Sequence, residues 1–492
     1  MKMENTSNLL LKYISATPQD KLDAGAISFY ANYEKVKEVF PEIADRIISE
    51  LKDQRTNLKL IASENYSSLS VQAAMGNLLT DKYSEGYPYH RFYAGCDNVD
   101  KIEDEAIKLA CELFGAEHAY VQPHSGADAN MVAFLSILSA KVEQPLIEKI
   151  GVSDVAKMER EDFNKIRAAF GQQKLMAMDY YSGGHLTHGY RHNFSSILFD
   201  AYTYTVNNET SRLDLDELRK QLHEVKPLIF LAGYSAYSRK INFAKMRELA
   251  DEVGAVFMVD MAHFAGLVAG GVFSGDYNPV PFAHVVTSTT HKTLRGPRGG
   301  FILCKKEFEE FLNKGCPAFL GGPLPHIIAA KAIAFKEALS PQFRQYAANI
   351  TQNAQALAQA LIKRGANILT GGTDNHLMLL DVQDTYGLTG RQAESALRSS
   401  GVTLNRNALP FDINGPWYTS GLRIGTPAVT SLGMSENEME CIADIIDNIL
   451  RHTKPVPDSK VKFETDLAVA EKSKKQVQEL LSRFLLYPEI II

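Results

Sequence analysis

The stretch STTHKTLRGPRGG, residues 288–300, contains a single lysine, Lys292, in a turn rich in glycine. Continuous apolar runs lie on both sides of it, HVVTST before and GFILC after. Runs that are apolar throughout, without alternation, are typical of strands covered by helices on both faces. The sequence therefore predicts that Lys292 lies at the end of a buried strand, where open α/β sheets bind their ligands.

Further segments support an α/β fold. Apolar runs at 228–233 and 255–260 predict two more buried strands, and amphipathic segments at 101–114 and 244–253 predict helices between strands. After about residue 330 the pattern predicts a second, smaller α/β unit that includes a capped helix beginning at Ser435. We expect three parts and one insertion: an N-terminal helical arm (1–80), a large domain (81–337), a polar helical insertion within it (about 142–174), and a small C-terminal domain (338–492).

Composition excludes several classes of protein. The 492 residues carry a net charge of −6, which gives no electrostatic reason to expect nucleic acid or an anionic membrane as partner. The five cysteines form no CxxC pair, so neither a metal site nor a disulfide framework is predicted, and a reducing compartment fits. Without a secretory apolar core or a run of about 20 apolar residues, we expect a soluble, cytoplasmic protein.

An acidic residue follows a neighbouring strand. In VDMAH (259–263), Asp260 ends an apolar run about thirty residues before Lys292. A lysine and an aspartate at the ends of two strands suggest pyridoxal phosphate: the lysine forms a Schiff base, and the aspartate keeps the pyridine nitrogen protonated. Taken singly, Asp260 could instead cap the next helix, and Lys292 could be an exposed loop lysine.

Two loops of small residues add to this pattern. QPHSGADAN (122–130) opens a helix and could offer the backbone N–H groups of Ser125, Gly126 and Ala127 to a phosphate. SGGHLTHG (182–189) could place His185 flat over a ring, although a lone histidine can equally be structural. Each loop alone is a weak signal.

The motifs occur together and in order with IASEN (61–65), KYSEGYPYHRFYAG (82–95) and SGLRIGTPAVT (420–430). In this combination the chain resembles the serine hydroxymethyltransferase family, which are pyridoxal-phosphate enzymes of the aspartate-aminotransferase fold (fold type I). The resemblance runs from about Tyr33 to the C-terminal region and leaves out the first thirty residues and the insertion. It implies a large domain with a mostly parallel seven-stranded sheet covered by helices, and a smaller C-terminal α/β domain.

The resemblance also implies roles for single residues. Lys292 would be the Schiff-base lysine, Asp260 would pair with the pyridine nitrogen, and His185 would stack on the ring. Further cofactor contacts are implied for Ser125, Gly126, Ala127, Ser235, His263 and His291, and, from the neighbouring subunit, for Tyr83 and Gly322. This sharing of residues implies an obligate homodimer, or a tetramer built from such dimers.

Substrate-binding residues follow from the same resemblance. Arg423 would bind the substrate carboxylate with a bidentate fork, assisted by Ser63 and Arg298. Glu85 would be the catalytic glutamate that handles protons as the one-carbon unit moves, with Tyr83 and Tyr93 on either side of it. At the folate site the implied residues are Tyr180, Leu186, Asn405 and Asn407.

The implied reaction belongs to one-carbon metabolism and glycine biosynthesis. L-serine and tetrahydrofolate are converted reversibly to glycine and 5,10-methylenetetrahydrofolate, through an aldimine and a quinonoid of pyridoxal phosphate. Two departures from the family pattern, Ala127–Asp128 in the phosphate loop and Tyr180–Tyr181 before SGGH, predict altered cofactor and folate affinity. Alternatives are a folate-independent aldolase or an alanine racemase on the same cofactor, and a non-catalytic protein of this fold.

Overall fold

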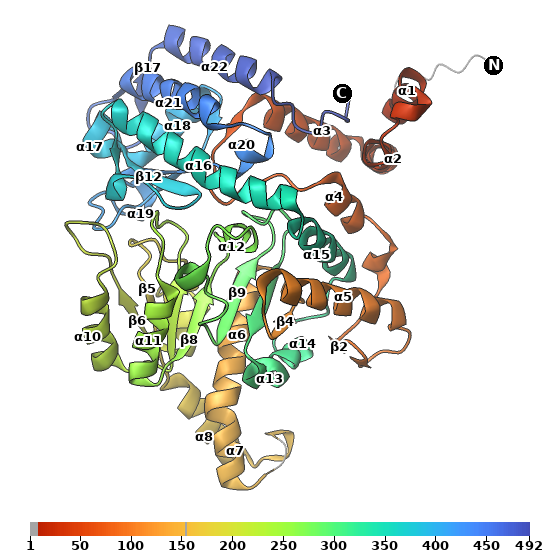
Figure 1. The fold of residues 1–492 in the computed structure, drawn as a ribbon, viewed down its shortest axis with the longest axis vertical. Coiled ribbons are helices and arrows are strands. Elements are labelled where there is room, and N and C mark those ends of the chain that lie inside the picture. The colour runs from red at the N-terminus through yellow and green to blue at the C-terminus, as the bar shows by residue number, and fades with distance from the viewer. Residues whose placement is uncertain (1–7, 153–154) are drawn as a thin grey trace.

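The structure is a computed structural model that describes residues 8–152 and 155–492, so residues 1–7 of the predicted arm and 153–154 of the predicted insertion lie outside it. Its centre is one seven-stranded sheet (Figure 1). In spatial order the strands are β4 (His118–Tyr120), β10 (Gly300–Cys304), β9 (Val285–Thr289), β8 (Val256–Asp260), β7 (Ile229–Gly233), β5 (Lys174–Met178) and β6 (Asp200–Tyr204). Strand β10 runs opposite to the other six strands, which share one direction, so the predicted mostly parallel sheet is confirmed.

Helices cover both faces of this sheet. Along β7, Phe230 and Ala232 point into one apolar core, whereas Ile229 and Leu231 point into the other. The first core is closed by α5 (Asp97–Phe114), α10 (Leu215–Val225), α11 (Phe243–Val253) and α15 (Pro325–Ala338), and the second by α6 (Gly126–Leu138) and α13 (Glu309–Asn313). Burial on both faces is why the central strand β7, with the sequence IFLAG, is apolar at every position.

A smaller sheet lies beside the large one (Figure 1). Its antiparallel strands are β11 (Asn367–Ile368), β12 (Leu377–Asp381), β15 (Gly421–Gly425) and β14 (Asn405–Asn407). Helices α16 (Pro341–Lys363), α18 (Gly390–Ser399) and α21 (Glu436–Arg451) pack against it. The predicted cap of α21 is present, because Ser435 and Glu438 form a reciprocal capping box.

The N-terminal segment is helical as predicted, with α1 (Leu9–Ala16), α2 (Ala24–Val39) and α3 (Pro41–Thr56). It continues into β1 (Leu58–Lys59), which pairs in parallel with β13 (Val402–Thr403). Leu58 and Leu60 thereby join the apolar core of the small sheet. The division at residues 80 and 337 remains a prediction.

The segment predicted as an insertion projects from the body of the molecule (Figure 1). It contains α7 (Gln144–Ile150) and α8 (Arg160–Gly171).

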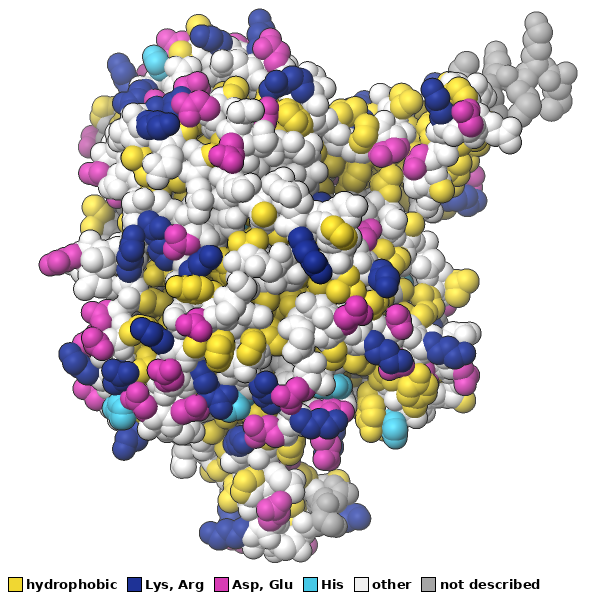
Figure 2. Space-filling model, in the orientation of Figure 1, with side chains coloured by type: hydrophobic (Ala, Val, Ile, Leu, Met, Phe, Trp, Pro, Cys, Tyr) yellow, Lys and Arg dark blue, Asp and Glu magenta, His cyan; other side chains and the backbone are white. Residues whose placement is uncertain are grey.

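On the face seen in Figure 2, lysines and arginines are interspersed with aspartates and glutamates. No helix within residues 8–152 and 155–492 combines the length and the apolar composition that crossing a membrane requires.

Candidate active site

Lys292 lies in the loop between β9 and β10, as the sequence predicts. The side chain of Asn65 donates to the Lys292 carbonyl at 2.8 Å and fixes the backbone of this loop. Burial lowers the pKa of the Lys292 amine to about 8; the Asp260 carboxylate opposes this shift, and the charges of Arg423 and Arg298 add to it. The amine is therefore partly neutral, and nucleophilic, close to neutral pH.

Asp260 ends β8, next to the strand that precedes Lys292. Its carboxylate accepts hydrogen bonds from the side chains of Asn130 (2.9 Å) and His188 (3.2 Å) and from the Ala262 N–H (3.0 Å). Burial alone would raise the pKa of Asp260, but these bonds and the neighbouring histidines hold it well below its ordinary value. The group is thus a buried anion suited to a protonated ring nitrogen.

His185 follows the tight Gly183–Gly184 turn. A Cβ on Gly184 would lie 2.0 Å from the Met178 carbonyl oxygen, so only glycine fits there. The His185 Nδ1 lies 2.8 Å from the Thr187 hydroxyl. Burial lowers the pKa of His185 to about 4, with the charge of His188 acting in the same direction, so its imidazole is neutral.

The loop predicted to bind phosphate opens α6. The Ser125 hydroxyl accepts from the Asp128 N–H at 3.1 Å and caps the helix, whose first N–H groups have no intrahelical acceptor. A Cβ on Gly126 would lie 2.7 Å from the Thr289 side chain, so the helix start approaches the end of β9 closely. Beside Lys292, the buried Nδ1 of His291 has no hydrogen-bond partner among the described residues.

These groups fit pyridoxal phosphate. Lys292 is a reactive amine, and Asp260 is a buried anion suited to the ring nitrogen. His185 is a neutral ring close to His188, which contacts Asp260. The start of α6 offers a dianion N–H groups and the positive end of the helix dipole. The chemistry of these groups matches the aldehyde, the pyridine nitrogen and the phosphate of the cofactor.

Arg423, on β15 of the small sheet, is held from two sides. Its Nε donates to the Asn405 side chain at 3.2 Å, and its Nη1 donates to the Ser235 carbonyl at 2.7 Å. Burial lowers the pKa of Arg423 to about 10, opposed by Tyr180, so the guanidinium remains a cation at neutral pH. Asn405 and Ser235 together fix the direction of the guanidinium. Asn405, which the resemblance implied at the folate site, thus orients Arg423.

Ser235 and His263 also make contacts within the protein, and their implied contacts with the cofactor stay predictions. The contacts of Ser235 are made by its backbone, whose carbonyl accepts from Arg423 and whose N–H donates to the Gly183 carbonyl at 2.7 Å. His263 is buried, and its Nδ1 lies 3.2 Å from Nε2 of His376 in the small domain. Both residues therefore connect the large domain to the small one.

The residues implied to serve the neighbouring subunit form a separate group. The rings of Tyr83 and Tyr93 meet edge to face at 5.2 Å, and the charge of Glu85 raises the pKa of both. A Cβ on Gly322 would lie 3.1 Å from the Tyr83 ring. Among the described residues of one chain, no hydrogen bond or ion pair joins this group to Lys292.

The remaining residues predicted to bind substrate or folate fall into two groups. Ser63, His291 and Arg298 line one cavity of about 520 Å³. Leu186 is exposed, the Tyr180 ring packs on Tyr181 and Tyr190, and the Asn407 side chain donates to the Ala408 carbonyl. Their roles toward substrate and folate stay predictions.

Sequence reasoning missed the residues that support the site. Asn130 and His188 hold Asp260, Asn65 holds the lysine loop, and His376 contacts His263. The first three lie inside the quoted motifs HSGADAN, GGHLTHG and IASEN. The available signal for these supporting residues was a polar side chain in the same motif as a predicted site residue.

Comparison with known proteins agrees with this geometry. The family model described as serine hydroxymethyltransferase matches residues 36–146 and 165–446. The chain belongs to the serine hydroxymethyltransferase family. The family model skips residues 147–164, which lie inside the predicted insertion.

Three relatives from this family cover nearly the whole chain, and each is named serine hydroxymethyltransferase. The protein from Treponema pallidum is 58% identical over 489 residues, covering 98% of this chain and 85% of its own length. The one from Cutibacterium acnes is 51% identical, covering 96% and 98%. The one from Chlamydia trachomatis serovar L2 is 49% identical, covering 98% and 99%.

Proposed function

We propose that this chain is a pyridoxal-phosphate-dependent transferase that moves the hydroxymethyl group of L-serine to tetrahydrofolate, giving glycine and 5,10-methylenetetrahydrofolate reversibly. One observation carries the proposal. The partly neutral Lys292 and the buried carboxylate of Asp260 lie at the ends of the adjacent parallel strands β9 and β8. Membership of the serine hydroxymethyltransferase family supports the substrate assignment.

Three polar groups of the cofactor have an assigned residue. Lys292 would bind the aldehyde, Asp260 the pyridine nitrogen, and the start of α6 at Ser125 and Gly126 the phosphate. When bound, pyridoxal phosphate supplies an electron sink for the negative charge left at the substrate Cα. Asn130 and His188 keep Asp260 ionised for this purpose, because they donate to its carboxylate.

Arg423 selects and orients the amino acid. A guanidinium fixed by Asn405 and Ser235 would hold the α-carboxylate in one orientation. Orientation decides which bond of the substrate Cα can break, since only a well-aligned bond reacts quickly. Leu186, Tyr180 and Asn407 are proposed to bind folate, and Ser63 and Arg298 to assist at the carboxylate.

Glu85 would move the proton of the serine hydroxyl oxygen. Its carboxylate raises the pKa of Tyr83 and Tyr93, so both phenols stay protonated and can donate hydrogen bonds. Since no hydrogen bond or ion pair among the described residues joins this group to Lys292, we propose a homodimer in which Glu85, Tyr83, Tyr93 and Gly322 of each chain complete the partner's site. We also propose a cytoplasmic location.

The test is a visible absorption spectrum of the loaded protein with glycine, before and after tetrahydrofolate is added. We expect a long-wavelength band that grows sharply with tetrahydrofolate, because the two binding sites act on one Cα proton. A spectrum that responds to glycine but ignores tetrahydrofolate would refute the transferase assignment and favour the aldolase or racemase.

A further inference from the structure

The loop of residues 234–240 connects the two side chains proposed to face substrate and cofactor ring. Its Ser235 carbonyl accepts from Arg423, and its Ser235 N–H donates to Gly183, two residues before His185. The position of Ser235 therefore sets where the carboxylate-binding Arg423 lies relative to the ring-stacking His185.

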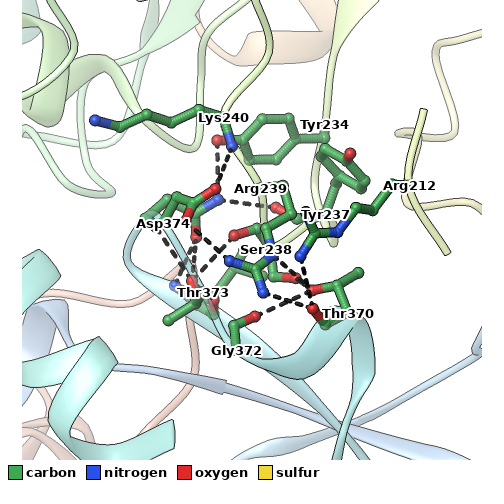
Figure 3. A network of polar contacts seen from close by, with 12 residues as sticks. Arg212, Tyr234, Tyr237, Ser238, Arg239, Lys240, Thr370, Gly372, Thr373 and Asp374 are labelled. Atoms are coloured by element: carbon green, nitrogen blue, oxygen red, sulfur yellow. Dashed lines mark hydrogen bonds and ion pairs between the residues drawn. The ribbon is translucent and has the colours of Figure 1, made fainter. Parts of the chain in front are cut away.

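The small domain holds the far end of this loop through residues 369–376 (Figure 3). The Asp374 N–H donates to the Ser238 carbonyl at 2.8 Å. The Asn375 side chain donates to the Tyr237 carbonyl at 2.9 Å. The loop is thus fixed to both domains, at Ser235 by Gly183 and beyond it by the small domain.

Thr370, at the start of this segment, has an unusual backbone. Its φ of 62° lies in the left-handed region, which a β-branched residue seldom adopts. Such a conformation persists only where the surroundings fix it. Here Arg239 does so: its Nε donates to the Thr370 hydroxyl at 2.9 Å and its Nη2 to the Thr370 carbonyl at 2.5 Å, and Arg212 adds a bond to the same carbonyl at 3.1 Å.

The same guanidinium also pairs with Asp374. Arg239 Nη1 lies 2.9 Å from Asp374 Oδ1, and the other carboxylate oxygen accepts from the Lys240 N–H at 3.2 Å. In Figure 3 the guanidinium lies between Thr370 and Asp374. The Arg239 side chain is only 16% exposed, so these contacts are partly shielded from solvent. We call Arg239, Thr370 and Asp374 the Arg239 cluster.

We propose that Arg239 is a positioning residue: by fixing the strained Thr370 turn to the 234–240 loop, the Arg239 cluster sets Ser235, and through it the orientation in which Arg423 binds the substrate carboxylate. The inference rests on the proposed function, because it assigns Arg423 that role. It predicts that the cluster governs affinity for the amino acid and leaves cofactor binding and the bond-breaking step unaffected.

The experiment is a titration of the loaded protein with glycine, followed by visible absorption, together with steady-state kinetics on L-serine. Arg239→Met should weaken glycine binding about tenfold, and Asp374→Asn, which removes the negative charge and one of the two acceptor oxygens but keeps Arg239 on Thr370, about threefold. KM for L-serine should rise by the same factors while kcat stays within about twofold. The pyridoxal-phosphate affinity of both variants should match the unsubstituted protein.

Arg364→Met is the matched control. Arg364 pairs with Glu440 and Asp444 and donates to the Ala360 carbonyl, all within the small domain and away from the 234–240 loop. Its loss should leave glycine affinity unchanged. Should Arg239→Met fail to fold, as shown by thermal unfolding, Asp374→Asn decides alone.

Unchanged glycine affinity in Asp374→Asn and in folded Arg239→Met would overturn the proposal. So would an equal loss of affinity in Arg364→Met, since any loosening of the small domain would then suffice. If the unsubstituted protein binds pyridoxal phosphate but no glycine, the proposed function itself fails and the inference fails with it.

Discussion

The rate at which the cofactor-free protein captures pyridoxal phosphate should report the pKa of Lys292. Only the neutral amine attacks an aldehyde, and burial lowers its pKa from 10.5 to about 8. At about pH 7.5 roughly a quarter of the amine is then neutral, against about one part in a thousand at an ordinary lysine pKa. Capture, followed by visible absorbance in a stopped-flow instrument, should accelerate about tenfold per pH unit and level off above about pH 8.

The direction of the shift can be tested with one substitution. The charge of Arg298 helps to lower the Lys292 pKa, so Arg298→Gln should move the pH midpoint upward. Since Arg298 is exposed, the fold should tolerate the change. Lys292→Ala should show no saturable capture. A midpoint near 10.5, or a rate that does not change with pH, would refute the argument that desolvation activates this lysine.

Three further predictions concern single contacts. Arg423→Lys loses the planar fork and should raise KM for L-serine about a hundredfold, with little change in pyridoxal-phosphate affinity measured by equilibrium dialysis. Gly126→Ala places a Cβ 2.7 Å from the Thr289 side chain and should weaken pyridoxal-phosphate binding, measured in the same way; unchanged affinity would argue against phosphate binding at α6. Unfolded and refolded together, Glu85→Gln and Lys292→Ala chains should recover about a quarter of normal activity, because half of the dimers are hybrids with one intact site; no recovery would contradict sharing between subunits.

Much of the fold followed from local pattern. The run ending at Asp260 is apolar up to that residue, and the run before Lys292 starts with two valines and continues with buried Thr287, Ser288 and Thr289; the two runs form the buried strands β8 and β9. Helix α5 was predicted to begin at residue 101 but begins at Asp97, since the acidic residues of its first turn carry no apolar period. By contrast, β1 has two residues and is defined by pairing with β13, more than 300 positions away, which no local pattern encodes.

In the site, too, local motifs predict some residues, whereas contacts between distant segments cannot be predicted from them. Lys292, Asp260 and Arg423 were predicted from their motifs, and the structure brings them close enough for their charges to act on one another. The contacts that orient them were not predictable, because each joins distant segments: Asn65 reaches Lys292, and Arg423 reaches Ser235. Ser235 illustrates the limit most clearly, since it contributes backbone groups whose direction depends on the fold and not on the residue type.

The most direct test of the central claim is the rate of glycine formation from L-serine by the loaded protein, measured with and without tetrahydrofolate. We predict that tetrahydrofolate raises this rate by orders of magnitude and that 5,10-methylenetetrahydrofolate appears in equal amount with glycine. Glycine formation at the same rate without tetrahydrofolate, with free formaldehyde as the second product, would contradict the account.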